Sequence, residues 1–322
     1  MENLKKQEKA MLRNDGKLEN NKKFTEFSDF PEYIEIQFSG KCNAFCKVCP
    51  HPQVRKEIPL GKMEVQLIDQ ILEECQHYRH KIINIEPYLN NEPFLDRDFL
   101  KTLRKIKKIG CNVEVSSNLS ILTYETIDAI VEEELISELR CSIFGFFYET
   151  YQSIMGLDYI NTWNNFFYLL KKVKQKKSLM TIQFTMIDKA GLISQEEITV
   201  ARKYFKELGV KFKVYPYLDR AENNGSKNEK VFLENKYKVV GCKSDYLKNR
   251  LAINYDGTVS LCCQDWRRQV IIGDLKTQTI KEIWDSKKVN SIREQMYGET
   301  DPAKAFFCQK CELALLEQVK VR

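Results

Sequence analysis

Short runs of strand-forming residues alternate with helix-length amphipathic segments over the first two thirds of this 322-residue chain. Ile, Val, Phe and Tyr, which favour strands, are frequent in six runs. These are residues 33–38, 82–89, 112–117, 139–144, 179–187 and 210–217. Strands that alternate with helices form a parallel sheet, because each helix returns the chain to the same edge. The rhythm therefore predicts an α/β fold whose parallel sheet is curved into a barrel or part of one.

Three of the intervening segments carry apolar residues at helical spacing, and they are residues 63–78, 96–110 and 194–209. Asp96 and Ser194 are suited to cap the start of their helices. Gly110 and Gly209 are suited to end them. In folds of this kind the active site lies at the C-terminal ends of the strands.

The pattern changes after residue 218. A polar stretch with an Asn-Asn-Gly-Ser turn signal predicts a linker, and two short strands follow at 251–263 and 269–275, with a turn at Asp256-Gly257. A helix is expected over 279–296 with Thr279 as its cap. The predicted parts are a solvated tail (1–30), the barrel (31–218), a linker (219–241) and a small C-terminal domain (242–322).

Composition excludes several classes of protein. The net charge of +6 is mild, and the basic runs, such as residues 171–177, are expected on solvated helix faces, so no nucleic-acid partner is predicted. The N-terminus lacks the apolar run of a signal peptide, and no stretch approaches a membrane span. We therefore predict a cytoplasmic protein without a membrane partner, in which eleven cysteines favour metal or thiol chemistry over disulfides.

Three of the cysteines, Cys42, Cys46 and Cys49, follow the first predicted strand within eight residues. Thiolates select iron–sulfur clusters, zinc or copper(I). A [4Fe–4S] cluster normally takes four cysteines, so three leave one iron open, as a catalytic site requires. A zinc site completed by His51 is the alternative, although His51 is expected to be a loop residue.

Four more cysteines occur in the C-terminal region. Cys242 and Cys262 precede a C-x2-C pair formed by Cys308 and Cys311. A C-x2-C pair is typical of metal sites. Four thiolates can fully ligate a zinc ion or a [4Fe–4S] cluster, which makes a closed site.

The C-x3-C-x2-C spacing after the first strand resembles that of the radical S-adenosylmethionine (radical SAM) superfamily. The resemblance implies a partial (β/α)6 TIM-like barrel, in which the open iron binds S-adenosylmethionine (SAM) and a 5′-deoxyadenosyl radical takes hydrogen from the substrate. Positions that match the cofactor-binding motifs of the family are Asn91, Glu92, Pro93, Ser117, Asn118 and Ser142. Two departures stand out. Asn91 replaces a glycine, and Val48 replaces the aromatic residue that usually precedes the third cysteine.

The C-terminal motifs resemble the SPASM/twitch extensions of the same superfamily, a small β-hairpin-plus-helix domain. Their order is similar to that in 2-deoxy-scyllo-inosamine dehydrogenases. Four cysteines imply one auxiliary [4Fe–4S] cluster, held by Cys242, Cys262, Cys308 and Cys311, that accepts an electron while a carbonyl forms. The predicted cofactors are thus two [4Fe–4S] clusters and SAM.

Cys263 follows the presumed ligand Cys262 directly. Because neighbouring side chains on a strand point to opposite faces, Cys263 is not expected to ligate the same cluster. Some radical SAM epimerases use a free cysteine to return a hydrogen atom to the substrate, which makes Cys263 a candidate catalytic residue. A buried core thiol is the other interpretation, and Cys75, Cys111 and Cys141 are expected in the core.

These features predict a radical SAM oxidoreductase that acts on a small polar substrate of sugar, aminocyclitol or nucleoside type. Flavodoxin or ferredoxin is the expected electron donor. Three alternatives remain: an epimerase that uses Cys263, an enzyme that modifies a ribosomal peptide, and a zinc-binding interaction protein without catalysis.

Overall fold

The computed structural model describes residues 27–225, 237–298, 300 and 306–318. Six parallel strands alternate with helices, as predicted. The strands are β1 (Tyr33–Ile36), β2 (Asn84–Glu86), β3 (Asn112–Ser117), β4 (Glu138–Ser142), β5 (Thr181–Asp188) and β6 (Lys211–Pro216). The α-helices of this part are α2 (His51–Val54), α3 (Val65–His77), α4 (Phe99–Ile109), α5 (Tyr124–Glu132), α6 (Tyr148–Ile154), α7 (Tyr159–Lys176) and α8 (Gln195–Leu208). Two short 3₁₀ helices, η1 (Arg79–Lys81) and η2 (Pro93–Leu95), flank β2.

The C-terminal part adds strands at the other edge of the same sheet. Its elements are β7 (Tyr237–Cys242), β8 (Arg250–Ile253), β9 (Thr258–Ser260), β10 (Ile271–Asp274), α9 (Ile280–Trp284), α10 (Lys287–Met296), η3 (Phe307–Lys310) and β11 (Ala314–Gln318). Strand β8 pairs in parallel with β1, and β9 and β10 continue antiparallel, which gives the order β10-β9-β8-β1-β2-β3-β4-β5-β6. β7 and β11 form a separate antiparallel pair. The predicted fold class, a partial barrel followed by a small β-and-helix domain, is confirmed.

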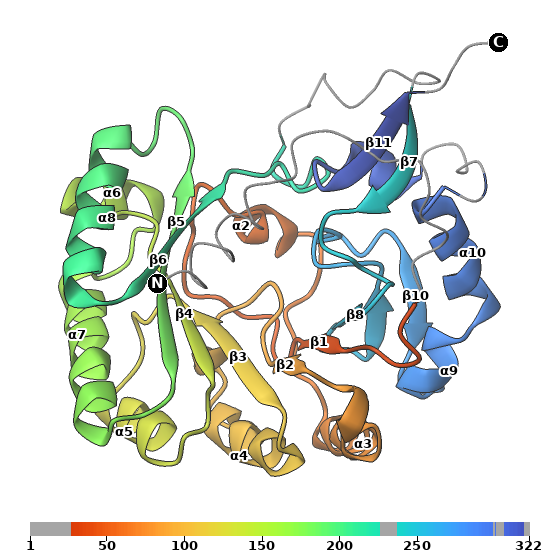
Figure 1. The fold of residues 1–322 in the computed structure, drawn as a ribbon, viewed down its shortest axis with the longest axis horizontal. Coiled ribbons are helices and arrows are strands. Elements are labelled where there is room, and N and C mark those ends of the chain that lie inside the picture. Colours follow the sequence, from red (N-terminus) through yellow and green to blue (C-terminus); the bar gives the residue numbers. More distant parts are fainter. Residues whose placement is uncertain (1–26, 226–236, 299, 301–305, 319–322) are drawn as a thin grey trace, which may run out of the picture.

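The two faces of the curved sheet differ in chemistry. Side chains alternate along a strand, so Ile34 and Ile36 of β1, both fully buried, face away from Glu35. Helices α4, α5, α7 and α8 lie along the outer side of β3 to β6, and α9 and α10 lie beside β10 (Figure 1). On that outer side Phe184 of β5 stacks on Phe205 of α8 at 4.0 Å. The concave side is left for polar residues.

The residues predicted to begin or end helices do so, with one exception. The Ser194 hydroxyl accepts a hydrogen bond from the backbone N–H of Glu197, and Gly110 ends α4 with φ +80°. The prediction that Asp96 caps α4 was wrong, because Asp98 occupies that position. Asp96 instead accepts a 3.0 Å hydrogen bond from the backbone N–H of Asp98, which tightens the turn before the helix.

The C-terminal region has more elements than predicted. The first predicted strand is two, β8 and β9, since the Asp256-Gly257 turn lies between them. The predicted helix over 279–296 is also two helices. Thr279 caps α9 with a full capping box, and Ser286 caps α10 by accepting a hydrogen bond from the backbone N–H of Val289. A second N-cap inside a helical pattern ends one helix and starts the next.

The predicted tail and linker both include packed residues. Phe30 is fully buried and stacks on Tyr78 at 4.3 Å, so the solvated tail cannot extend to residue 30. Residues 1–26 lie outside the described part of the chain. In the predicted linker, Asn223 is buried and donates a 3.1 Å hydrogen bond from Nδ2 to the carbonyl of Gln264. Residues 226–236 of this linker are also outside the described part.

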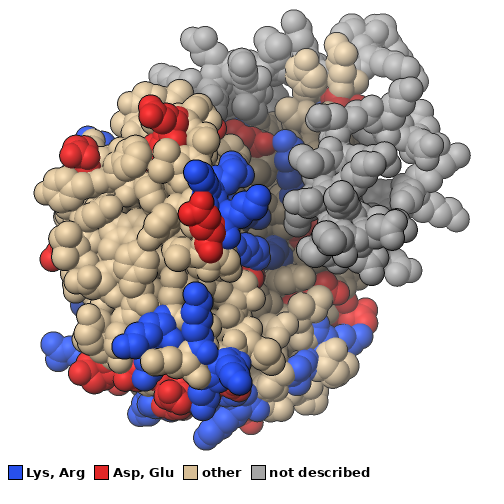
Figure 2. All heavy atoms as spheres, turned by 60° about the vertical axis from the view of Figure 1, so that its left-hand side comes forward, with Lys and Arg blue, Asp and Glu red and all other residues tan. Residues whose placement is uncertain are grey.

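Basic residues at the end of α7 lie on the surface. Lys171, Lys174 and Lys176 are exposed. In the lower part of the face in Figure 2, Lys and Arg side chains gather with Asp and Glu among them. The run at 171–177 is thus a solvated helix face, as predicted. Among the described residues, no helix has both the length and the apolar character needed to span a membrane.

Candidate active site

The first cysteine cluster lies in the loop that follows β1. Cys46 is buried and Cys42 and Cys49 are half-buried, all as free thiols. Burial, the Glu92 carboxylate and the neighbouring Cys49 raise the pKa of Cys42 to about 12. Burial, Cys49 and Cys42 likewise raise the pKa of Cys46. The three thiols therefore lie close to one another, and a metal cluster would be needed to hold them as thiolates.

Glu92 is the centre of the polar network beside this loop. Its carboxylate is buried, and it accepts 2.8 Å hydrogen bonds from the Ser117 hydroxyl and the backbone N–H of Asn118. Its own backbone N–H donates to the carbonyl of Lys41, next to Cys42. Burial raises the pKa of Glu92 to about 7. The predicted residues Glu92, Ser117 and Asn118 are thus brought together beside the cysteine loop.

The network includes two residues that sequence analysis missed. Asn43, inside the cysteine motif, accepts a 2.9 Å hydrogen bond from Nδ2 of Asn118 and donates one of 2.8 Å to the hydroxyl of Ser120. The Ser120 hydroxyl in turn donates to Oδ1 of Asn118. These bonds join the cysteine loop to the end of β3. The signal was available, since Asn43 lies between two cysteines and Ser120 lies in the same Ser-rich segment as Asn118.

The other predicted cofactor-binding residues have local partners. Oδ1 of Asn91 accepts a 3.0 Å hydrogen bond from the backbone N–H of Leu89, which closes the turn before Glu92. Pro93 is buried and begins η2. Ser142 shares a 2.8 Å hydrogen bond with the Ser116 hydroxyl, on the concave face at the end of β4. Ser142 has no contact with Glu92 among the described hydrogen bonds.

His51 begins α2, where its Nε2 donates a 3.0 Å hydrogen bond to the carbonyl of Gly40. This contact gives the ring a structural role in the loop. In the described ranges, no three His, Cys, Asp or Glu side chains are placed to hold a single metal ion in common.

The second set of cysteines gathers at the base of the C-terminal region. Cys242 ends β7, Cys262 follows β9, Cys308 lies in η3, and Cys311 directly follows η3. Burial and then the thiols of Cys263, Cys308 and Cys311 raise the pKa of Cys262. Burial, Cys311 and Cys242 act in the same direction on the pKa of Cys308. Four thiols from three segments of the chain are thus near enough to influence one another's ionisation.

Cys263 lies in different surroundings from Cys262. It is in the turn after β9, not on a strand, so strand alternation does not apply to it. Burial raises the pKa of Cys263 to about 12, and the charges around its thiol are those of Glu35, Arg220 and Glu86. The Tyr246 hydroxyl lies beside it. Cys263 therefore borders the concave face of the barrel, whereas Cys262 lies among the other C-terminal cysteines.

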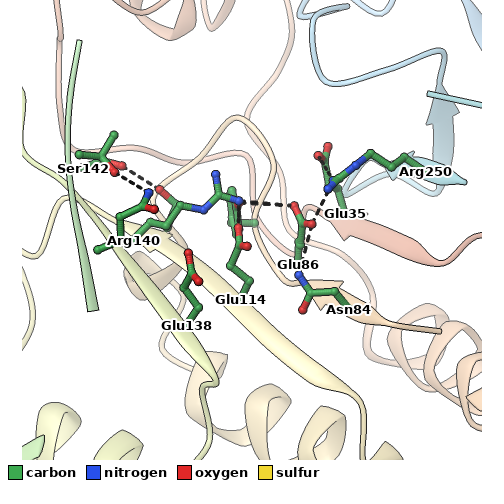
Figure 3. Close-up of polar contacts among 12 residues, drawn as sticks. Glu35, Asn84, Glu86, Glu114, Glu138, Arg140, Ser142 and Arg250 are labelled. Carbon is green, nitrogen blue, oxygen red and sulfur yellow. Dashed lines mark hydrogen bonds and ion pairs between the residues drawn. The ribbon is translucent and has the colours of Figure 1, made fainter. Parts of the chain in front are cut away.

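Charged side chains from neighbouring strands meet on the concave face (Figure 3). Glu35 of β1 lies opposite Glu86 of β2 in the sheet, and both are buried. Nη1 of Arg250 is 3.0 Å from Oε1 of Glu86. On the other side Arg140 pairs with Glu114 (Figure 3). Sequence analysis missed this set, although each glutamate is a charged residue within an apolar strand run.

Comparison with protein families matches residues 36–189 to the radical SAM superfamily and residues 242–312 to SPASM, an iron–sulfur cluster-binding domain. The chain has a radical SAM domain followed by a SPASM domain. No curated protein was found to match the sequence of this radical SAM–SPASM chain. The domain pair makes it a radical SAM enzyme, so the interpretation as a zinc-binding interaction protein is set aside.

Several solved structures share the fold of this radical SAM–SPASM chain. BtrN in complex with AdoMet and 2-DOIA has a TM-score of 0.54 and 17% identity, over 90% of this chain and 94% of BtrN. Streptococcus suis SuiB bound to precursor peptide SuiA has a TM-score of 0.64 and 13% identity, over 97% of this chain and 81% of SuiB. Native anSMEcpe with bound AdoMet has a TM-score of 0.60 and 14% identity, over 87% of this chain and 86% of anSMEcpe. At these identities the likeness concerns the fold.

The domain pair implies one [4Fe–4S] cluster for each domain together with SAM, as predicted. The residues present fit these groups. Three grouped thiols in one loop suit a cluster with one open iron, and four grouped thiols suit a closed cluster. A buried carboxylate beside the open site suits the amino group of SAM.

Proposed function

We propose that this radical SAM enzyme is an oxidoreductase that acts on a small polar substrate of sugar, aminocyclitol or nucleoside type. The observation that supports this proposal is the charged concave face, which carries Glu35, Glu86, Glu114, Arg140 and Arg250. Buried charges rarely add stability that apolar packing would not supply. Such a set is therefore better explained by a polar ligand.

In this proposal each cysteine set holds one cluster. Cys42, Cys46 and Cys49 hold the catalytic cluster, and Cys242, Cys262, Cys308 and Cys311 hold the auxiliary one. Asn91, Glu92, Pro93, Ser117, Asn118 and Ser142 are proposed to bind SAM. When bound, SAM and the catalytic cluster would supply a 5′-deoxyadenosyl radical, to which the substrate loses one hydrogen atom, and the auxiliary cluster would supply an acceptor for one electron. The substrate also loses a proton to a base, which completes the carbonyl. The enzyme is expected to work in the cytoplasm, with flavodoxin or ferredoxin as electron donor.

Counting iron tests the assignment of the clusters. Protein purified anaerobically and reconstituted with iron and sulfide should contain about eight irons, and a Cys42/Cys46/Cys49→Ala triple variant about four. SAM should change the EPR signal of the reduced protein in wild type alone. Cys111→Ala, which removes a half-buried thiol outside both sets, serves as the matched control and should keep about eight irons. Zinc in wild type and triple variant alike, or about four irons in both, would contradict the proposal.

A specific observation favours epimerisation as the second candidate. Cys263 borders the concave face, where the charges of Glu35 and Arg220 act on its thiol. In that place a thiol can return a hydrogen atom to a substrate radical. Epimerisation predicts an inverted product that carries deuterium from D2O, and loss of that product in Cys263→Ser but not in Cys111→Ser. A carbonyl product without deuterium would instead support oxidation.

The size of the substrate distinguishes a third interpretation, in which a ribosomal peptide is modified. Among the structures that share the fold, SuiB was solved with a precursor peptide and BtrN with 2-DOIA. The buried charges on the concave face favour the smaller, more polar ligand. Turnover of a peptide with no turnover of small polar molecules would reverse that preference.

A further inference from the structure

The cysteine loop after β1 has a buried side and a side that faces solvent. Buried and exposed side chains alternate over residues 44–48, where Ala44, Cys46 and Val48 are buried and Phe45 and Lys47 are exposed. Phe45 is 60% exposed, although it directly precedes the proposed cluster ligand Cys46. A molecule that contacts the outer side of this segment would therefore lie one residue away from a ligand of the catalytic cluster.

The segment that carries this loop is positively charged. It has no Asp or Glu between Glu35 and Glu57, and its cations there are Lys41, Lys47, Arg55 and Lys56. The three lysines are exposed and the arginine is half-buried. Among the residues that the structure describes, no carboxylate forms an ion pair with any of these four cations. Glu57 does not balance them either, because it pairs with Arg267 at 2.8 Å.

The exposed aromatic ring of Phe45 lies among these cations. Cζ of Arg55 is 3.6 Å from the centroid of the Phe45 ring, so the guanidinium covers one face of the ring. Nζ of Lys47 donates a 3.1 Å hydrogen bond to the hydroxyl of Ser153 in α6, a neutral partner that leaves the charge unbalanced. Aromatic residues and Arg are enriched at protein interfaces. Unbalanced surface charge attracts a partner of the opposite sign.

The position of this surface indicates what kind of partner it fits. Its residues flank a ligand of the cluster that, in the proposed function, receives an electron from another protein. We propose that Phe45, Lys47 and Arg55 form the docking surface for an acidic protein that delivers one electron to the catalytic cluster. The proposal rests on the proposed function. In the transfer the carrier loses one electron and the cluster gains it, and no bond or proton moves. A small charged contact suits such a transient encounter.

The salt dependence of electron transfer in wild type tests the role of charge. Reconstituted protein with SAM receives electrons from a reduced bacterial flavodoxin, from a reduced bacterial ferredoxin, both acidic, or from saturating dithionite, and 5′-deoxyadenosine is measured. With at least one carrier at subsaturating concentration, the rate should fall at least about threefold between about 20 and 300 mM NaCl. A rate independent of salt with both carriers would overturn the proposal. So would cleavage of SAM with dithionite and with neither carrier.

Two double variants connect the transfer to the surface. Lys47→Glu/Arg55→Glu should lower the rate with the carrier at least about tenfold, while iron stays at about eight and the rate with dithionite is unchanged. Arg202→Glu/Lys203→Glu on α8 is the matched control. It reverses the same number of charges, and Cζ of Arg202 likewise lies over a ring, 5.6 Å from the centroid of Phe212. Equal rates with the carrier in the two double variants would overturn the assignment. The salt dependence of wild type needs no variant, so it stands if a variant does not fold.

The reaction with dithionite distinguishes this inference from the proposed function. Dithionite is a small reductant that needs no docking surface. Cleavage of SAM with dithionite, together with equal rates with the carrier in both double variants, would refute the docking surface and leave the radical SAM assignment intact. Absence of cleavage with dithionite and with both carriers, in a protein with about eight irons, would count against the proposed function itself.

Discussion

The backbone N–H of Asn118 donates a 2.8 Å hydrogen bond to Oε2 of Glu92, and this bond joins the loop after β2 to the end of β3. Both segments lie at the C-terminal ends of their strands, beside the cysteine loop. The buried carboxylate therefore has two tasks. It holds the two strand ends together, and it offers negative charge beside the place where the amino group of SAM is expected.

Replacement of Glu92 by Gln should separate these tasks. The amide keeps the size of the side chain but brings donors towards the donors of Ser117 and Asn118. We expect SAM affinity to fall at least about tenfold, from the loss of hydrogen bonds to a charged group, while iron content stays at about eight. Equilibrium binding of SAM measures this. Glu133→Gln, which changes an exposed carboxylate paired with Arg104, is the control. Unchanged SAM binding in Glu92→Gln would contradict the assignment.

Removal of Arg250 should be costly for stability. Its guanidinium contacts Glu86 and Glu35, both buried, so Arg250→Met removes the cation of Glu35 and leaves Glu86 with Arg140 at 4.0 Å. The expected loss in the free energy of unfolding is about 3–5 kcal/mol. Arg104→Met breaks an exposed pair with Glu133 and should cost less than about 1 kcal/mol. Urea unfolding of both variants checks the difference, and similar losses in the two would disprove it.

The stability of the protein should fall between about pH 5 and pH 8 because of Glu35. Burial, and then the charge of Glu86, raises the pKa of Glu35 to about 7 from an ordinary value of 4.5. The folded state therefore binds a proton that the unfolded state has already lost in this window. Stability is highest where both states are protonated, falls while only the unfolded chain has ionised, and levels off once Glu35 ionises in the fold as well.

The size of this effect follows from the shift, on the order of 2 kcal/mol across the window. Glu35→Gln removes the titrating group, so its unfolding free energy should change less with pH than that of wild type. Chemical denaturation at pH 5, 6, 7 and 8 measures both proteins. Parallel curves for the two would show that Glu35 titrates normally.

Gly273 should not tolerate a side chain. It lies in β10, and a Cβ atom there would be 2.5 Å from Cγ1 of Ile283 in α9. Gly273→Ala is expected to cost about 1–3 kcal/mol through overpacking. In the background Ile283→Ala, which removes the contacted atoms, the same change should cost much less. Thermal or urea unfolding of the four proteins gives this double-mutant cycle, and equal costs in the two backgrounds would refute the contact.

Much of the fold was predictable because local patterns agree with the final structure. Strand runs such as 112–117 reappear with the same bounds, and Ser194, Gly110 and Thr279 mark helix ends as predicted. These features depend on a few neighbouring residues. The break of the last helix at Ser286 was missed, since an N-cap residue also occurs within helical patterns and only the tertiary structure decides between the two.

The arrangement of the site was less accessible from the sequence. The grouping of Glu92, Ser117 and Asn118 came from motif resemblance, and the structure places them together. The contacts of Asn43 with Asn118 and of Arg250 with Glu86 join residues far apart in the chain. Such pairs depend on sheet order. In particular, nothing local predicts that β8 pairs with β1.

That pairing has a consequence for how the chain matures during synthesis. Tyr33 is the register partner of Arg250, so one edge of β1 stays unsatisfied until the ribosome has made almost the whole protein. An exposed strand edge invites association with other chains, and a pairing so distant in sequence forms late. During this interval the unpaired edge of β1 in the nascent barrel is exposed, and chaperones are expected to bind it. A chain truncated before β8 would keep this edge of β1 unpaired.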